Sequence, residues 1–126
     1  MLALTPKPDE LPWHQQFSPN DPFDCDAAEV GMWVDMQAGS ALLKTPVQDN
    51  RSGFVYLLDR TNTKLLAANR YVKGNWADKI DSAAGRPVES AVMERVRTGA
   101  DEAITPSVLG GKNWQPMSCN PSTGLA

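Results

Sequence analysis

Histidine and cysteine are scarce in this chain of 126 residues, which contains only His14, Cys25 and Cys119 of these two types. A single histidine cannot build a zinc site of several imidazoles, and no GxSxG nucleophile elbow accompanies it. The two cysteines stand far apart and form no CxxC pair, which excludes a zinc ribbon and a thioredoxin-like site. The sequence leaves a disulfide and two free thiols both open, and we favour two free thiols.

Long apolar runs, phosphate loops and a basic surface are also missing. No stretch approaches the roughly 18 apolar residues of a membrane-spanning helix, and there is no GxGxxG motif. Residues 1–8 lack the basic and long apolar regions of a signal peptide, so we expect any export signal of a parent protein upstream of this start. A net charge of −3 lacks the basic footprint of a nucleic-acid binder, and no such partner is expected.

Lysine and arginine are absent between residues 8 and 43, whereas carboxylates are frequent there. A solvated acidic surface is the simpler interpretation for most of these side chains. The alternative is a cation site or a catalytic carboxylate somewhere in the run. The carboxylates are Asp9, Glu10, Asp21, Asp24, Asp26, Glu29 and Asp35.

Ten prolines and nine glycines interrupt the chain, which favours short strands joined by turns over long helices. The clearest predicted strand is 54–58, an apolar run of β-branched and aromatic residues, and 64–72 is its hairpin partner. Residues 2–17 are typical of a strand, a turn and a second strand. Shorter strands are predicted at 30–36 and at 42–43.

One short helix is predicted at 87–98, because Pro87 suits a first helical position and valines follow at helical spacing. Gly99 is expected to end it. Residues 18–26 have the composition of a loop.

A weak internal repeat consists of an Asp or Asn followed by a short turn that ends near a Gly and an apolar residue. The best copy is 58–66, and further copies are 80–88, 119–125 and a decayed one at 4–11. An Asp or Asn side chain can close such a turn by accepting backbone hydrogen bonds, and Gly supplies positive φ. A turn that recurs between short strands is typical of a β-propeller.

Three stretches together resemble the quinoprotein alcohol dehydrogenases, the family of methanol and ethanol dehydrogenases that use pyrroloquinoline quinone (PQQ). Trp13–Asp24, WHQQFSPNDPFD, is similar to the family pattern W-x-x-Q-x-T-P-x-D-x-W-D. Asn50–Thr61, NRSGFVYLLDRT, is similar to N-R-N-G-F-x-Y-x-L-D-R-T. Leu109–Met117, LGGKNWQPM, is similar to G-G-x-N-W-x-P-M. The resemblance covers nearly the whole chain and is loosest over 87–104.

The resemblance implies an all-β fold, an eight-bladed propeller several times longer than this chain. Residues 1–126 would form about two blades of it, as an internal piece truncated at both ends. Most of the family's metal ligands lie upstream of the matching region. We therefore expect the isolated chain neither to bind PQQ tightly nor to oxidise alcohols.

The resemblance also implies site residues. Asp24 matches the catalytic aspartate, the base that takes the alcohol proton, and Arg51 matches the basic residue that hydrogen-bonds the quinone oxygens. Asn113 and its neighbour Trp114 match residues beside the cofactor. Asp24 and Asp26 are the expected metal ligands, and the extra Asp26 resembles the lanthanide-using branch, so Ca²⁺ and a lanthanide both remain open.

The chain departs from the family pattern at Phe23, where tryptophan is usual, at Thr63, where the turn normally has glycine, and at Pro46, where a strand is expected. These departures leave substrate range and activity open. Two alternatives stand beside the alcohol dehydrogenase, namely a non-catalytic propeller that serves as a scaffold, and a PQQ-dependent sugar dehydrogenase. For the parent protein the resemblance implies a small alcohol substrate, a cytochrome c-type electron acceptor and a periplasmic location.

Overall fold

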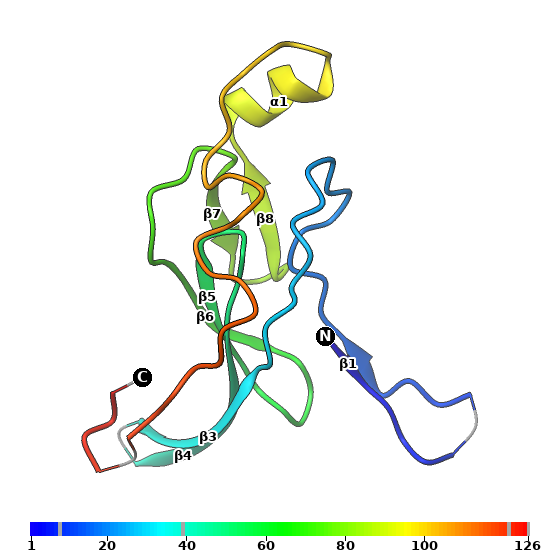
Figure 1. Cartoon of the computed structure of the whole chain (residues 1–126). Helices are drawn as coiled ribbons and strands as arrows, with labels where there is room; N and C mark the ends of the chain where they lie inside the picture. Colours follow the sequence, from blue (N-terminus) through cyan, green and yellow to red (C-terminus); the bar gives the residue numbers. More distant parts are fainter. Residues whose placement is uncertain (8, 39, 121, 126) are drawn as a thin grey trace.

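The computed structural model describes residues 1–7, 9–38, 40–120 and 122–125. Pro8 and Pro121, which stand in two of the predicted repeat turns, lie outside the described residues. The described chain is built mainly from antiparallel strands and has one short helix (Figure 1). The elements are β1 Leu2–Ala3, β2 Trp13–His14, β3 Met32–Ala38, β4 Ala41–Asp49, β5 Phe54–Leu58, β6 Leu65–Arg70, β7 Ala77–Asp81, β8 Arg86–Glu89 and α1 Ala91–Arg97.

The largest sheet contains four antiparallel strands in the order β3-β4-β5-β6. The predicted strand 54–58 is confirmed, but β4 is much longer than the two residues predicted at 42–43. Pro46 is tolerated inside β4 because β4 pairs with β5 only over Val47–Asp49. Pro46 therefore pairs with β3 but has no partner residue in β5, so its missing N–H breaks no pairing with β5.

The core lies on one face of β5, where Phe54, Tyr56 and Leu58 are buried while the residues between them are only half-buried. Phe17 joins this face from the segment after β2, and its ring centroid lies 4.6 Å from that of Tyr56. Burial raises the pKa of the Tyr56 phenol to about 12. Trp76 packs edge-on against Phe54, with ring centroids 6.1 Å apart. The core thus fixes both the end of the N-terminal arm and the start of β7.

The predicted helix 87–98 begins later than expected, at Ala91. Pro87 does not start the helix, because it belongs to β8, which pairs with β7 in a hairpin that the sequence did not predict. The true N-cap is Ser90, whose side chain accepts a hydrogen bond from the backbone N–H of Met93. The predicted end is confirmed, since Gly99 follows the helix with a φ of +92°.

Three copies of the repeat lie between two antiparallel strands, and the fourth, 119–125, is closed by an antiparallel bridge between Asn120 and Leu125. Copy 58–66 joins β5 to β6, copy 80–88 joins β7 to β8, and copy 4–11 separates β1 from β2. In the best copy the Asp59 carboxylate accepts hydrogen bonds from Thr61, and these lower the pKa of Asp59. The interpretation of the repeat as turn modules between strands is therefore confirmed for the described residues.

Thr63→Gly is expected to raise the free energy of unfolding by about 1 kcal/mol, because a β-branched residue in the left-handed region is strained by about that amount. Thr63 has a φ of +63°, while the corresponding glycines of two other copies, Gly85 and Gly124, have values of +66° and +69°. Urea unfolding of the two proteins measures the change. Asn62→Gly, beside it in the same turn, is the control, and it should not stabilise the chain. Equal or lower stability of Thr63→Gly would contradict the prediction.

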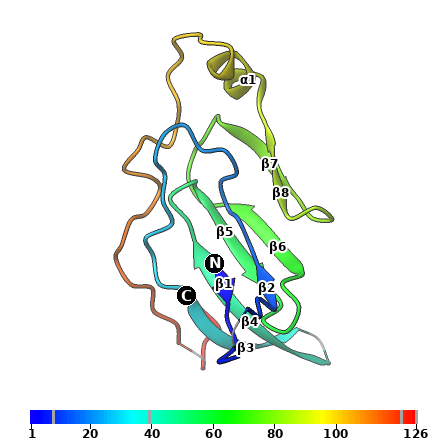
Figure 2. The same cartoon turned by 90° about the vertical axis from the view of Figure 1, so that its right-hand side faces the viewer.

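After α1 the described residues form no further helix or named strand, and the chain runs along one side of the molecule toward the C-terminus (Figures 1 and 2). Cys25 and Cys119 are both free thiols, as we favoured. Within the described ranges no helix is both long and apolar enough to cross a bilayer.

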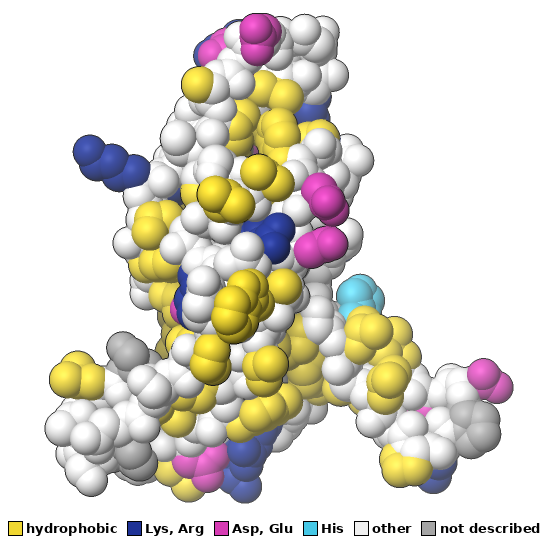
Figure 3. All heavy atoms as spheres, viewed as in Figure 1, with side chains coloured by type: hydrophobic (Ala, Val, Ile, Leu, Met, Phe, Trp, Pro, Cys, Tyr) yellow, Lys and Arg dark blue, Asp and Glu magenta, His cyan; other side chains and the backbone are white. Residues whose placement is uncertain are grey.

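Large apolar side chains remain exposed over much of the surface, and apolar groups are scattered over the whole face seen in Figure 3. The exposed large apolar residues are Leu2, Leu4, Leu11, Val30, Trp33, Leu42, Tyr71, Val88, Val108, Leu109, Trp114 and Leu125.

Candidate functional site

Arg51 lies in the tight turn between β4 and β5, and its neighbours hold that turn closed. The backbone N–H of Gly53 donates to the carbonyl of Asn50 at 2.9 Å, and Asn50 N–H donates to the carbonyl of Phe54 at 2.9 Å. The side chain of Asn50 accepts a further bond from Ser52 N–H at 3.0 Å. Gly53 has a φ of +88°, which glycine adopts without strain. The turn therefore presents Arg51 from a fixed backbone.

The C-terminal segment is joined to this turn by three successive residues. Gly111 N–H donates to the carbonyl of Arg51 at 3.0 Å. Lys112 Nζ lies 3.2 Å from Asp49 Oδ1, and both side chains are largely buried. Arg51 Nη2 donates to Asn113 Oδ1 at 2.7 Å, the distance of a strong hydrogen bond from a charged donor. Residues 49–51 and 111–113 therefore form one unit, although they are far apart in the sequence.

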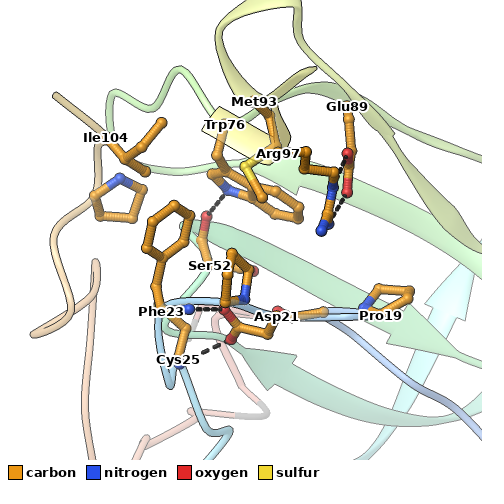
Figure 4. A pocket seen from close by; sticks show the side chains of 13 residues that line it. Pro19, Asp21, Phe23, Cys25, Ser52, Trp76, Glu89, Met93, Arg97 and Ile104 are labelled. Atoms are coloured by element: carbon orange, nitrogen blue, oxygen red, sulfur yellow. Dashed lines mark hydrogen bonds and ion pairs between the residues drawn. The ribbon is translucent and has the colours of Figure 1, made fainter. Parts of the chain in front are cut away.

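Asp24 lies in the loop that passes beside Arg51. Arg51 Nη1 donates to the backbone carbonyl of Asp24 at 3.3 Å. Asp24 has a φ of +58°, and its two neighbours are fixed by Asp21, whose carboxylate accepts from Phe23 N–H and from Cys25 N–H, each at 2.8 Å. Figure 4 shows both bonds as dashed lines. The loop thus holds Asp24 in an unusual backbone conformation next to the arginine.

Charged and polar groups with unused hydrogen-bonding capacity surround Arg51. Burial raises the pKa of Glu29, and the nearby positive charges of Lys112 and Arg51 oppose that effect. Gln48 donates to Glu29 Oε2 at 3.4 Å. Glu29 Oε1, Asn50 Nδ2, Arg51 Nε and Ser52 Oγ are among the buried atoms of the described residues that have no hydrogen-bond partner. Unpaired buried polar atoms carry a cost in stability, and here they cluster around Arg51.

Tyr71 borders the same region and ties it to the end of β6. Its hydroxyl donates to the carbonyl of Asn50 at 2.8 Å. Burial raises the pKa of Tyr71, and the negative charges of Asp49 and Glu29 raise it further. Tyr71 therefore remains a neutral hydrogen-bond donor at physiological pH.

A small cavity of about 30 Å³ lies behind the Asp24 loop, between the loop and α1. Its walls are mainly apolar and include Phe23, Trp76, Met93 and Ile104, with Cys25 beside them (Figure 4). Burial raises the pKa of the Cys25 thiol, and the neighbouring carboxylates raise it further. Phe23 and Cys25, on either side of Asp24, line this cavity, so the loop forms one of its walls.

The structure brings together three of the five residues that the sequence singled out. Asp24, Arg51 and Asn113 are linked by hydrogen bonds. Asp26 and Trp114 are exposed, Trp114 by 69%, and no hydrogen bond among the described residues joins them to this group. The described residues contain no group of three or more His, Cys, Asp or Glu close enough to hold a metal ion. Asp24 and Asp26 alone therefore cannot complete a metal site.

Sequence reasoning missed the partners that hold this group in place. The closing of the Asp24 loop by Asp21 has a local sequence signature, since Asp often accepts hydrogen bonds from backbone N–H groups two residues later. The pair of Lys112 with Asp49 has no local signature, because its members come from distant parts of the chain.

No family model matches this chain. Among curated proteins, it is 39% identical over 125 residues to quinohemoprotein alcohol dehydrogenase ADH IIB of Pseudomonas putida, covering 99% of this chain and 18% of that enzyme. It is 34% identical over 130 residues to quinoprotein alcohol dehydrogenase PedH of the same species, covering 98% of this chain and 22% of that enzyme. The chain thus spans about a fifth of the length of these relatives.

Solved structures give the same result. Quinohemoprotein alcohol dehydrogenase ADHIIG from Pseudomonas putida matches with a TM-score of 0.87 and 30% identity, over 96% of this chain and 18% of the enzyme. The quinohemoprotein alcohol dehydrogenase of Comamonas testosteroni matches with a TM-score of 0.86 and 33% identity, over 98% of this chain and 18% of that enzyme. A europium-containing methanol dehydrogenase matches with a TM-score of 0.75 and 32% identity, over 86% of this chain and 19% of that enzyme.

Proposed function

Since this chain is homologous over nearly its whole length to the quinoprotein alcohol dehydrogenases, and its fold matches part of their β-propeller, we propose that it forms part of an enzyme that oxidises primary alcohols to aldehydes by hydride transfer to PQQ. The observation that carries the proposal is the bonding of Arg51 to both Asn113 and the backbone of Asp24. Three residues that match the family's site by position come from three distant segments and meet at one place. A scaffold propeller has no need to bring them together.

Asp24 is proposed as the general base that takes the hydroxyl proton of the alcohol. A carboxylate suits this role when it is accessible to substrate and held in a fixed orientation. The Asp24 side chain is exposed, and its backbone is held on both sides by Asp21 and by Arg51. The side chain is therefore accessible to a substrate while the backbone that carries it is held in place.

Arg51 and Asn113 are proposed to face the cofactor. When bound, PQQ supplies the electrophilic quinone carbonyl that accepts the hydride. A fixed guanidinium stabilises negative charge at a neighbouring oxygen, and Asn113 holds the Arg51 guanidinium at 2.7 Å. Trp114 is exposed next to Asn113, and its indole is proposed to line the same cofactor surface.

Asp24 and Asp26 are proposed to contribute to a Ca²⁺ or lanthanide site. Both ions take many oxygen ligands, six to eight or so for Ca²⁺, so two carboxylates can provide only part of the set. A bound cation would polarise the quinone oxygen and favour the ionised form of a carboxylate that contacts it. The remaining ligands would come from parts of a longer protein.

For the whole enzyme we propose a small alcohol as substrate, a cytochrome c-type or haem-containing electron acceptor, and a periplasmic location. The names of the quinohemoprotein relatives support the haem acceptor, because they state that those enzymes carry haem as well as quinone. The sugar dehydrogenase alternative has no support among these relatives, which are named alcohol, ethanol and methanol dehydrogenases.

The isolated chain of 126 residues is expected to show no PQQ-dependent reduction of an electron-accepting dye with ethanol as substrate. Its surface exposes many large apolar side chains that further blades of a propeller would cover, and the outer edge of β3 has no partner strand among the described residues. The assay uses the purified chain with PQQ and Ca²⁺ or La³⁺ and compares it with an intact relative. Any PQQ-dependent dye reduction by the purified chain would contradict the expectation, and the intact relative shows that the assay works.

The DNA on both sides of this reading frame tests the proposal. We expect the frame to continue and to encode further strands with the repeat turn, together with the metal ligands that this chain lacks. A frame bounded on both sides by stop codons would contradict a role in a complete enzyme.

A further inference from the structure

We propose that Asp21 is a positioning residue that holds the Asp24 carboxylate in its working orientation. The inference rests on the proposed role of Asp24 as the base. It assigns to Asp21 a task that neither binds substrate nor transfers a proton. In the resemblance to known enzymes Asp21 is one position of a motif, whereas its task follows from the contacts of its carboxylate.

Both oxygens of the Asp21 carboxylate are used on either side of Asp24. Oδ1 accepts from the backbone N–H of Phe23 at 2.8 Å, and Oδ2 accepts from the backbone N–H of Cys25 at 2.8 Å. Figure 4 shows the Asp21 carboxylate beside the backbone of Phe23 and Cys25, with a dashed line to each. The peptide groups that flank Asp24 are therefore fixed by a single side chain.

The conformation of Asp24 explains why such fixation is needed. Its φ of +58° lies in the left-handed region, which most residues other than glycine avoid and which aspartate adopts only occasionally. Without a constraint, the loop would relax toward negative φ and the Asp24 side chain would turn away from its present direction. The two hydrogen bonds to Asp21 oppose that relaxation because each would be lost when the flanking peptides rotate.

Asp21 is itself held against the rest of the fold. Phe17 anchors the chain in the core just before the loop. Arg97, from α1, donates to the carbonyl of Asn20 at 3.1 Å, and the same guanidinium forms an ion pair with Glu89 at 2.5 Å. The core and α1 thus fix the residues just before Asp21. Its carboxylate in turn fixes the backbone around Asp24.

The chemistry of the side chain makes a graded test available. An aspartate offers two acceptor oxygens, an asparagine offers one, and an alanine offers none. Asp21→Asn therefore keeps one of the two loop bonds, and Asp21→Ala loses both. The effect should appear in kcat rather than in KM, because a misplaced base slows the chemical step without removing a substrate contact.

The test uses a chimera in which this chain replaces the aligned segment of the ADH IIB enzyme of Pseudomonas putida, loaded with PQQ and metal. Asp21→Ala is expected to lower kcat for ethanol on the order of 10-fold with KM within about twofold, and Asp21→Asn should fall between it and the unsubstituted chimera. Asp81→Ala is the matched control. Asp81 closes the β7–β8 turn with bonds of 2.9 and 2.7 Å from Ala83 and Ala84, away from the site, and its loss should leave kcat unchanged.

A second measurement examines the loop without turnover. In the full chain of 126 residues, amide hydrogen exchange at Phe23 and Cys25 should be at least about 10-fold faster in Asp21→Ala than in the unsubstituted chain. Equal exchange rates at these two amides would overturn the proposal, even if the chimera variants do not fold.

The outcomes separate this inference from the proposed function. Loss of turnover in Asp24→Asn together with full turnover in Asp21→Ala would overturn the role of Asp21 alone. Full turnover in Asp24→Asn would leave alcohol oxidation in place but would overturn the role of Asp24 as the base and with it the role of Asp21. An equal fall of kcat in Asp81→Ala would show a general effect of turn loss and would overturn the positioning role.

Discussion

Asp24→Asn in the chimera with ADH IIB is expected to lower kcat for ethanol on the order of 1000-fold, which is within the range for the loss of a general base. Asparagine has nearly the same shape as aspartate and tolerates positive φ, so the loop with its φ of +58° should remain folded. The amide cannot accept the hydroxyl proton, however. The chemical step should therefore slow while the protein keeps its cofactor.

Steady-state kinetics with ethanol and an artificial electron acceptor measures this effect. Asp9→Asn is the matched control, because Asp9 is likewise exposed and has a φ of +61°, but it lies in the turn between β1 and β2. The control should retain the turnover of the unsubstituted chimera. If Asp24→Asn retains at least half of the turnover with PQQ bound, Asp24 is not the base.

Gly110→Ala is expected to weaken PQQ binding by the chimera on the order of 100-fold, because it displaces the segment that holds Arg51. A Cβ at Gly110 would lie 2.8 Å from Arg51 Cα and 2.9 Å from Arg51 Cβ. A contact with a backbone atom cannot be relieved by a change of rotamer, so the two segments must separate. Their separation would break the bonds of Arg51 with Gly111 and Asn113.

The φ of Gly110 is +79°, so a loss of stability from backbone strain accompanies the clash. Gly99→Ala separates the two effects. Gly99 has a φ of +92°, but nothing lies within 4 Å of a Cβ built there, so this variant carries the strain without the clash. Titration of each apo-chimera with PQQ gives the affinities. Equal affinities in the two variants would mean that the contact of Gly110 with Arg51 does not govern cofactor binding.

The parts of the fold that were predictable are those with a local pattern. The apolar run of β5 matches its observed bounds, and the repeat located the turns that follow β5 and β7, although not the strands β7 and β8 themselves. The β7–β8 hairpin was not predicted, because β7 reads ADKID and carries few apolar residues. The predicted helix wrongly included part of β8, because Pro87 was taken as its first residue. A proline near the start of a strand and one at the start of a helix look alike in sequence.

The site was predictable only through resemblance. Nothing in the composition or periodicity of the chain connects Arg51 to Asn113, which meet because the C-terminal segment docks on the β4–β5 turn. Local chemistry could have identified Asp21, whose bonds reach only to Phe23 and Cys25. Long-range pairs require the tertiary structure, because a sequence records which residues are present but not which segments become neighbours.

Alcohol-dependent dye reduction by the unsubstituted chimera, with and without added PQQ, tests the central claim most directly. We expect turnover within about 10-fold of intact ADH IIB when PQQ is present, and none without it, because hydrogen bonds bring Asp24, Arg51 and Asn113 together in this chain. A chimera that folds and binds PQQ but oxidises no alcohol would contradict the claim. It would show that this segment keeps the fold of the quinoprotein alcohol dehydrogenases without their chemistry.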